Sequence, residues 1–181
     1  MKQQTQYYKD NLYSRQIGVL GDVCMKKISN IKACLIHLDT TGFEIAKCLV
    51  LMGIKQLYIY DSRVPNASHI GLNIALIKDC TDTIAIQTKK YLDTLNPFVE
   101  ITIIHNINYH EILPTLPIQV CIQTNIQYYV HISNYCHTHN VKYIFSYQYN
   151  LTGYIFNDFG THSFYNRNGE KPLTCYVKKC Y

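Results

Sequence analysis

A strand, a turn, a helix and a second strand that ends on an acidic residue follow one another in this chain. Residues 32–37 form a short, continuous apolar run, and Gly42 precedes residues 43–52, whose apolar positions cover most of a helix circumference. Residues 55–60 are typical of a second strand. Asp61 follows Gly42 by about 20 residues, the spacing of the ribose-binding acid in Rossmann-type folds. This order predicts a buried parallel sheet, an architecture that serves many functions.

The same alternation of strand and helix continues to residue 147. Each apolar run is followed by a segment of helical period, as in a parallel sheet with crossover helices. The expected fold class is α/β, a Rossmann-like, doubly wound, mainly parallel sheet with a helical N-terminal arm. The further elements that we expect are helices over 81–95 and 128–139 and strands over 99–104, 118–123 and 141–147.

Composition excludes several classes of protein. The chain has 181 residues, 48% of them hydrophobic, which suits one domain with a real core. No apolar run approaches the roughly 20 residues that span a bilayer, and the polar start lacks the apolar region of a signal peptide. We therefore expect a location in the cytoplasm or nucleus and no membrane partner. The net charge is +5, but the lysines are scattered, so no nucleic-acid partner is expected.

The eight cysteines do not form a metal or redox motif. No pair has Cys-x-x-Cys spacing, which is typical of buried thiols in a reducing compartment. Cys136-His137-Thr138-His139 has no second half elsewhere in the chain, so we expect no metal. Cys175 and Cys180 have no neighbours that would lower a thiol pKa, and no cysteine is nominated as a nucleophile.

Two motifs resemble the opening of ubiquitin-activating enzymes. Tyr13-Ser14-Arg15-Gln16 is similar to their N-terminal arm, and Gly42-Phe43-Glu44-Ile45-Ala46-Lys47 to the helix after their glycine-rich turn. Further similar segments include Asn168-Gly169-Glu170-Lys171-Pro172. The resemblance places the chain in the ThiF/MoeB/HesA-type adenylating superfamily, as the N-terminal, inactive adenylation half. In that family two Rossmann-like halves pair, and an active half adenylates the C-terminus of a ubiquitin-like protein.

The resemblance also suggests a division of the chain. Residues 1–30 would form an N-terminal arm and residues 31–150 a Rossmann-like, ThiF-type domain. Residues 151–181 would be a β segment with a turn at Asn168-Gly169, leading to an inserted domain that this sequence does not contain.

The turn that should cradle phosphates has lost its glycines. Such a turn needs glycine so that the backbone can approach the phosphates and aim its amides at them. Here it reads His37-Leu38-Asp39-Thr40-Thr41-Gly42, and we expect Gly42 to serve helix-to-sheet packing. The carboxylate of Asp39 would occupy the free amides itself, as Thr40 or Thr41 could, and would repel a triphosphate. The degenerate loop of Asp39, Thr40, Thr41 and Gly42 is therefore not expected to bind a cofactor.

Two other phosphate-binding features of active halves are missing. Where those halves carry an arginine and a lysine, the matching region offers Gly71-Leu72-Asn73 and Thr81-Asp82-Thr83. Where they carry a magnesium-binding aspartate, Gln123-Thr124-Asn125 places Thr124. Without cation, acid and glycine loop, phosphoryl chemistry has no electrostatic support.

One catalytic feature remains. The resemblance implies that Arg15 reaches in trans to the ATP phosphates bound by the partner half, and its planar donor fork suits that role. The alternative is an arm arginine paired with Asp10 or Asp22. Asp61 is interpreted as a vestigial, structural acid at a strand end, because the phosphate loop beside it is gone.

The favoured function is a non-catalytic adenylation half, uncertain as an enzyme on its own, that pairs with an active half or subunit. ATP and magnesium would bind in the partner half, and ubiquitin or a ubiquitin-like protein would meet the chain through the complex. A close alternative is the small subunit of a heterodimeric activating enzyme for another ubiquitin-like modifier. From other classes, a Rossmann-type nucleotide-dependent oxidoreductase and a structural interaction protein remain.

Overall fold

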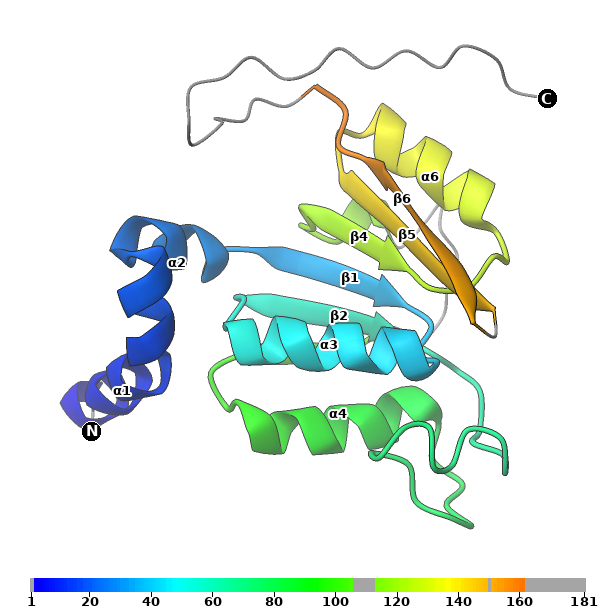
Figure 1. The fold of residues 1–181 in the computed structure, drawn as a ribbon, viewed down its shortest axis with the longest axis horizontal. Coiled ribbons are helices and arrows are strands. Elements are labelled where there is room, and N and C mark those ends of the chain that lie inside the picture. The colour runs from blue at the N-terminus through cyan, green and yellow to red at the C-terminus, as the bar shows by residue number, and fades with distance from the viewer. Residues whose placement is uncertain (1, 106–112, 150, 162–181) are drawn as a thin grey trace.

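Six strands form one sheet in the computed structural model, which describes residues 2–105, 113–149 and 151–161, with side chains from residue 11 onward. The order is β3-β2-β1-β4-β5-β6, and the first five strands are parallel. Figure 1 shows the twisted sheet with helices on both faces. The α/β fold class is confirmed. The strands are β1 (Lys32–Ile36), β2 (Gln56–Tyr60), β3 (Glu100–Ile103), β4 (Val120–Gln123), β5 (Lys142–Tyr149) and β6 (Thr152–Asp158).

Alternate residues of the central strands pack into two separate hydrophobic cores, one on each face of the sheet. Leu35 and Leu57 face α3 (Thr40–Met52) and α4 (Ile84–Leu95), with which they form one buried cluster. The neighbouring positions Cys34 and Tyr58 lie on the other face, in the cluster that contains the buried residues of α6 (Tyr129–Thr138). Both faces of the central strands are therefore buried, which explains why their sequences are continuously apolar.

The arm consists of two helices beside one end of the sheet. Helix α1 (Lys2–Leu20) and helix α2 (Asp22–Ile28) meet at Gly21, whose φ of 78° is readily adopted by glycine. Figure 1 shows both helices next to the start of β1 and the end of α3. No helix of the described residues is both long and apolar enough to cross a bilayer.

The boundaries differ from those predicted by only a few residues, apart from the region after residue 150. Helix α4 begins at Ile84 because the side chain of Thr83 caps it, accepting a hydrogen bond from the amide of Ile86. A short 3-10 turn, η1 (Leu113–Thr115), precedes β4. Strand β6 pairs antiparallel with β5 over seven residues and thus extends the sheet across the proposed boundary at residue 150. The three-part division stays a prediction, and Asn168-Gly169, Cys175 and Cys180 lie outside the described residues.

Candidate functional site

The candidate site is the edge of the sheet where β1, β2 and β4 end. In an open parallel sheet, ligands bind beyond the carboxyl ends of the strands, where the chain turns from one side of the sheet to the other. The order β2-β1-β4 places that point between β1 and β4. The turn from His37 to Gly42, Asp61 and Thr124 all directly follow these strands, so the predicted residues do come together here.

His37 takes the backbone conformation that glycine adopts easily. Its φ is 68°, an uncommon value for a residue with a side chain. The amide of His37 donates to the carbonyl of Tyr60, 2.8 Å away, and the two rings meet edge to face. Burial lowers the pKa of His37 from its ordinary value, although Asp61 acts in the opposite direction. The turn thus has a left-handed residue that carries an imidazole side chain packed against Tyr60.

Asp39 occupies the start of α3. Its carboxylate Oδ1 accepts a hydrogen bond of 2.8 Å from the amide of Gly42, as an N-cap does. The prediction that Asp39 satisfies an amide of this helix is confirmed, whereas Thr40 and Thr41 lie within the helix and do not cap it. Thr41 instead has its hydroxyl 2.9 Å from the side-chain oxygen of Gln148 on β5. The helix end is already occupied by a negative charge of the chain itself.

Gly42 lies where the start of α3 packs against the residues that follow β1 and β4. A Cβ atom at this position would be 2.3 Å from the carbonyl oxygen of His37 and 3.0 Å from the hydroxyl of Thr124. The expected packing role of Gly42 is confirmed. Thr124 is 2% exposed, and its hydroxyl donates to the same carbonyl of His37 at 3.1 Å. Thr124 therefore braces the turn from the position at which the resemblance places a magnesium ligand.

Asp61 is buried and fully engaged. Its Oδ2 accepts from the amide of Leu38 at 2.9 Å, and Arg63 forks onto both of its oxygens, Nε to Oδ1 at 2.9 Å and Nη2 to Oδ2 at 2.6 Å. Burial alone would raise the pKa of Asp61, but the hydrogen bonds from Arg63 and Leu38 lower it below its ordinary value. These contacts support the interpretation of Asp61 as a structural acid. Arg63 was missed, although its spacing of two residues from a strand-end aspartate could have suggested the pair.

The region that should supply phosphate-binding cations serves the fold instead. Asn73 is 2% exposed, and its Oδ1 accepts from the amide of Ala75. Asp82 pairs with Lys90 at 2.6 Å, and Thr83 caps α4. The guanidinium of Arg63, which lies near the loop, is held by Asp61.

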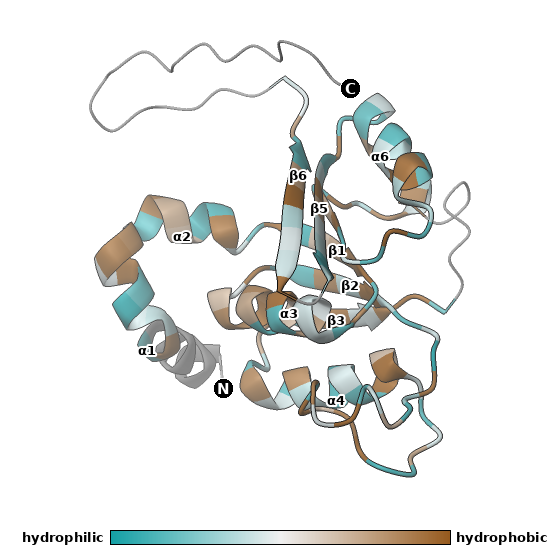
Figure 2. Cartoon of the chain, turned by 45° about the vertical axis from the view of Figure 1, so that its right-hand side comes forward, coloured by the Kyte–Doolittle hydropathy of each residue, from teal (hydrophilic) through white to brown (hydrophobic). Residues whose placement is uncertain are grey.

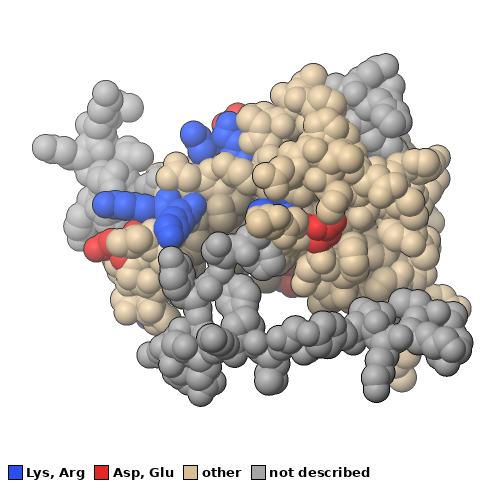
Figure 3. Space-filling view, turned by 90° about the horizontal axis from the view of Figure 1, so that it is seen from above, with Lys and Arg blue, Asp and Glu red and all other residues tan. Residues whose placement is uncertain are grey.

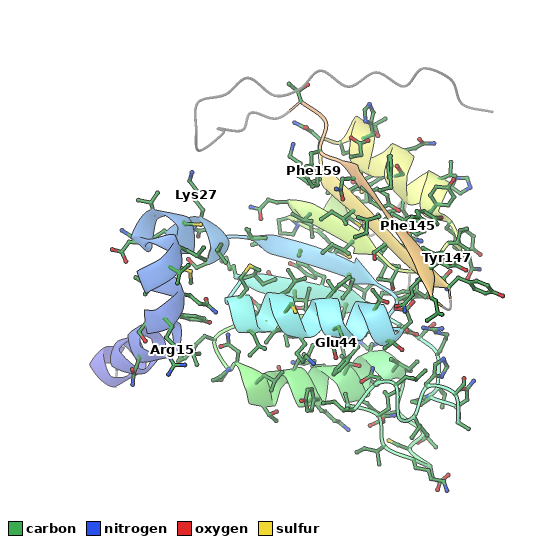
Figure 4. All side chains as sticks on the ribbon, viewed as in Figure 1. Arg15, Lys27, Glu44, Phe145, Tyr147 and Phe159 are labelled. Atoms are coloured by element: carbon green, nitrogen blue, oxygen red, sulfur yellow. The ribbon has the colours of Figure 1, made fainter. Side chains whose placement is uncertain are left out.

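Arg15 lies at the opposite end of the molecule. Helix α3 runs for 13 residues, about 20 Å, from the candidate site to the arm. Figure 4 shows Arg15 beside the far end of α3 and Glu44 near its start. Arg15 is exposed, and within the described side chains it makes no ion pair, neither with Asp22 nor with another acid. The side chain of Asp10 lies outside the described residues, so the paired alternative stays open there.

The described cysteines do not form a site. Cys34, Cys121 and Cys136 are fully buried in the core beside α6. The neighbouring thiols of Cys136 and Cys34, together with burial, raise the pKa of Cys121 well above its ordinary value, which keeps the thiol protonated. His137 pairs with Asp158 at 2.8 Å. Within the described part of the chain, no group of three or more His, Cys, Asp or Glu side chains has the geometry to hold a metal ion.

Solved structures define the class of fold. The chain is similar to Escherichia coli MccB in complex with selenomethionyl MccA, with a TM-score of 0.67 and 19% identity over 76% of this chain and 44% of that one. The complex of MccB with succinimide gives a TM-score of 0.65 and 18% identity, over 75% of this chain and 44% of that one. At this identity the likeness shows the fold alone, an α/β fold of Rossmann type.

Sequence relatives then give the family. The chain is 32% identical to ubiquitin-activating enzyme E1 1 of Candida albicans over 169 residues, which are 91% of this chain and 16% of that protein. It is 27% identical to human ubiquitin-like modifier-activating enzyme 1 over 93% of its own length and 16% of the relative's. No protein-family model matches the chain. The chain is an E1-like adenylation-type domain, homologous to about one sixth of the length of ubiquitin-activating enzymes, and the resemblance of its motifs to those enzymes is confirmed.

Proposed function

We propose that this chain is a non-catalytic adenylation half that acts by pairing with an active half, which adenylates the C-terminus of ubiquitin with ATP and magnesium. In this proposal the chain binds no nucleotide of its own and works in the cytoplasm or nucleus. Its relatives support an adenylation-type domain of the ubiquitin pathway. The inactive role rests on the geometry of the loop.

The observation that carries the proposal is the contact between Asp39 and the amide of Gly42. A phosphate at a helix N-terminus needs these amides and the positive end of the helix dipole. Here the carboxylate of Asp39 already accepts the amide hydrogen at 2.8 Å. A phosphate about 4 Å from that carboxylate would meet a repulsion of about 4 kcal/mol per pair of unit charges at an effective dielectric constant near 20. The site is thus closed by a group of the chain itself.

The remaining parts of the site add no compensating charge. Thr124 offers a neutral hydroxyl that is committed to the carbonyl of His37, so it is a poor replacement for a magnesium-binding carboxylate. Arg63 lies close enough to the loop for its charge to interact with that of Asp39, and its fork is bound to Asp61. A bound triphosphate would therefore find neither a metal ligand nor an uncommitted arginine here.

Pairing is supported by an apolar surface on the last two strands, here called the hairpin surface. Ile155 is 69% exposed and Phe156 47% exposed on β6, the border strand of the sheet. Phe145 links this strand to α6, because its ring lies 5.3 Å from that of Tyr129 and 5.5 Å from that of Tyr154. Figure 2 shows apolar residues along β6. The hairpin surface consists of Tyr149, Leu151, Tyr154, Ile155 and Phe156, with Ile155 on the opposite face of β6 from Tyr154 and Phe156.

Such a surface is typical of one that a partner covers. Soluble monomers seldom leave large apolar patches in contact with water, and stable partners bury them. Figure 3, which views the molecule from above, shows basic side chains gathered toward the arm and mainly uncharged residues on the rest of the described part of this face. An apolar, weakly charged face suits a protein partner better than a nucleic acid.

Arg15 would be the chain's contribution to catalysis. It is exposed at the arm, about one length of α3 away from its own closed loop, so it cannot serve that loop. In a pair of halves, an arm arginine is free to reach the phosphates bound by the other half. The proposal therefore gives the chain a scaffold role and a single charged contact.

A second candidate is the small subunit of an activating enzyme for another ubiquitin-like modifier. The chain is 26% identical to SUMO-activating enzyme subunit aos-1 of Caenorhabditis elegans over 84% of its own length and 48% of that protein. This similarity to a subunit of an activating enzyme is the observation that supports the second candidate. The segment from Asn168 to Pro172 favours the ubiquitin type.

The test is a pull-down of the tagged chain followed by mass spectrometry, then ATP–pyrophosphate exchange by the recovered complex. An active adenylation half should co-purify, and the modifier that stimulates exchange separates the two candidates. In that complex Arg15→Ala should lower exchange roughly ten- to a hundredfold without loss of partner binding, since it removes a charge-assisted contact. Recovery of no adenylating partner, or exchange by this chain alone, would contradict the proposal.

A further inference from the structure

The arm is fastened to the end of the molecule that lies opposite the candidate site. Tyr13 is 6% exposed, although the residues on either side of it in α1 are exposed. Its ring lies against Gly53, and its hydroxyl reaches Asn96. Gly53 and Asn96 directly follow the last residues of α3 and α4, so one arm side chain contacts the ends of two core helices. Tyr13, Gln16, Gly53 and Asn96 are here called the arm latch.

Gly53 is a glycine for two independent reasons. Its φ of 82° is the left-handed conformation that ends α3. A Cβ atom at this position would also lie 2.5 Å from both Cζ and Oη of Tyr13. The second reason has nothing to do with ending a helix. It shows that the Tyr13 ring occupies the space of the missing side chain.

Asn96 joins the arm to the core through hydrogen bonds from both donors of its carboxamide. It is 1% exposed, and its Nδ2 donates to Tyr13 Oη and to the carbonyl of Val50, each at 2.7 Å. Its Oδ1 accepts from the amide of Phe98 at 3.1 Å. A buried side chain with all of these bonds is held in one orientation, because any rotation would leave a buried polar group without a partner. The Tyr13 hydroxyl therefore meets a fixed donor.

The helical spacing of the arm turns Arg15 away from the helix face that contacts the core. Residues three apart share a helix face, so Gln16 lies on the same face as Tyr13. The Nε2 of Gln16 donates to the carbonyl of Leu51 at 3.1 Å, which adds a second attachment to the end of α3. Arg15 is about 200° around the helix from Tyr13 and is exposed. The motif Tyr-Ser-Arg-Gln thus combines two fastening side chains with one that projects outward.

We propose that Tyr13 is a positioning residue: through Asn96 and Gly53 it fixes the arm helix so that Arg15 points at the phosphates held by the partner half. This inference rests on the proposed function, because it concerns the same arginine. A cation on a docked helix is oriented before the partner's ATP arrives, whereas a cation on a loose helix must lose conformational freedom first. The contribution of Tyr13 to exchange should therefore exist only while Arg15 is present.

The experiment compares Tyr13→Phe with wild type in the assembled complex. The phenylalanine keeps the ring against Gly53 and removes only the bond to Asn96, which retains Val50 as a partner. Amide hydrogen exchange in residues 11–20 should become about three- to tenfold faster, as expected for the loss of one net hydrogen bond. ATP–pyrophosphate exchange should fall by a similar factor in its maximal rate, with the KM for the modifier unchanged. Ser14→Ala is the matched control, because among the described residues the Ser14 hydroxyl bonds to the carbonyl of Asn11, within its own helix turn.

The double variant decides whether Tyr13 acts through Arg15. When Arg15 is already alanine, adding Tyr13→Phe should lower exchange no further, whereas two independent effects would multiply. Multiplying effects, or unchanged hydrogen exchange in Tyr13→Phe, would overturn the inference. If Arg15→Ala alone leaves exchange at the wild-type rate, the proposed role of Arg15 fails and so does positioning by Tyr13, while faster hydrogen exchange in Tyr13→Phe would still establish the latch as a structural contact.

Discussion

The polar groups near the two ends of helix α3 differ in whether they are bonded within the chain or exposed to solvent. At its start, the Gly42 amide, the Asp61 carboxylate and the Arg63 guanidinium are all bound to other groups of the chain. At its far end, Tyr13 and Gln16 are bound to the core, while Arg15 between them is exposed and makes no ion pair among the described side chains.

The start of α3 therefore has no polar group available to a ligand among those named, whereas Arg15 at the arm is exposed to solvent. A ligand at the start of α3 would have to displace internal hydrogen bonds and a like charge, whereas a ligand at the arm would meet a cation whose support is already in place. The comparison teaches that the two parts of the proposal, an inactive loop and an active arm arginine, are compatible in one domain. They depend on different residues, and the length of α3 separates them.

The largest expected effect concerns close packing at the start of α3. Gly42→Ala should destabilise the fold by about 3 kcal/mol or more, because the new Cβ meets the backbone carbonyl of His37, which cannot move without shifting β1. Gly53→Ala should cost less, about 1–2 kcal/mol, since its obstacle is the movable Tyr13 side chain and the strain of a positive φ. Urea unfolding measures both changes.

Gly18→Ala serves as the control for both glycine variants. Gly18 lies inside α1 with nothing within 4 Å of its Cβ position, so alanine should stabilise the arm by up to about 1 kcal/mol. Equal losses of stability in Gly42→Ala and Gly53→Ala, or a loss of stability in Gly18→Ala, would contradict the distinction between the two ends of α3.

The next largest effect concerns the ion pair at the start of α3. Arg63→Met leaves the buried carboxylate of Asp61 without its guanidinium. Because Arg63 is 39% exposed, solvent screens the pair, and we expect a loss of about 2 kcal/mol, less than the roughly 3–5 kcal/mol of a fully buried pair.

The same ion pair predicts how the stability of the fold changes with pH. The pKa of Asp61 is lower in the folded state than in the unfolded chain, so the pair stabilises the fold above about pH 4 and this contribution disappears as the pH falls further. In Arg63→Met, Asp61 stays buried without the guanidinium, so its pKa should rise. The loss of stability on acidification should then begin at a higher pH. Urea midpoints between pH 3 and 7 for both proteins measure the shift, and parallel curves would contradict it.

A smaller effect is expected at the N-cap. Asp39→Ala removes the acceptor for the Gly42 amide and should cost about 1 kcal/mol in a urea titration. Asp39→Asn should cost less, since asparagine is also a good N-cap. Neither change restores the missing glycines or a metal ligand. Both variants should therefore remain without measurable nucleotide binding, and tight ATP binding by Asp39→Ala would show that charge alone had closed the site.

Much of the fold could be predicted from local sequence. The strands β1 and β2 are buried on both faces, so their apolar runs were visible, and Asp39 and Gly42 had roles that follow from helix ends and close packing. These features depend on residues a few positions apart. The two-residue spacing of Asp61 and Arg63 belongs to the same range and could have been recognised.

Other features could not be predicted because they join distant residues. Tyr13 and Asn96 are 83 positions apart, and neither carries a local pattern that names the other. The pairing of β6 with β5 was likewise not evident, since most β6 residues are exposed and lack the apolar alternation of a half-buried strand. Such contacts depend on the tertiary arrangement of whole elements rather than on propensity.

The most direct test of the closed site is a calorimetric titration of the isolated chain with ATP and magnesium. The account predicts no binding tighter than about millimolar, because the start of α3 offers an occupied amide, a nearby carboxylate and a committed arginine. A relative with an intact glycine-rich loop, titrated under the same conditions, provides the positive control. Micromolar, magnesium-dependent binding by this chain would contradict the account.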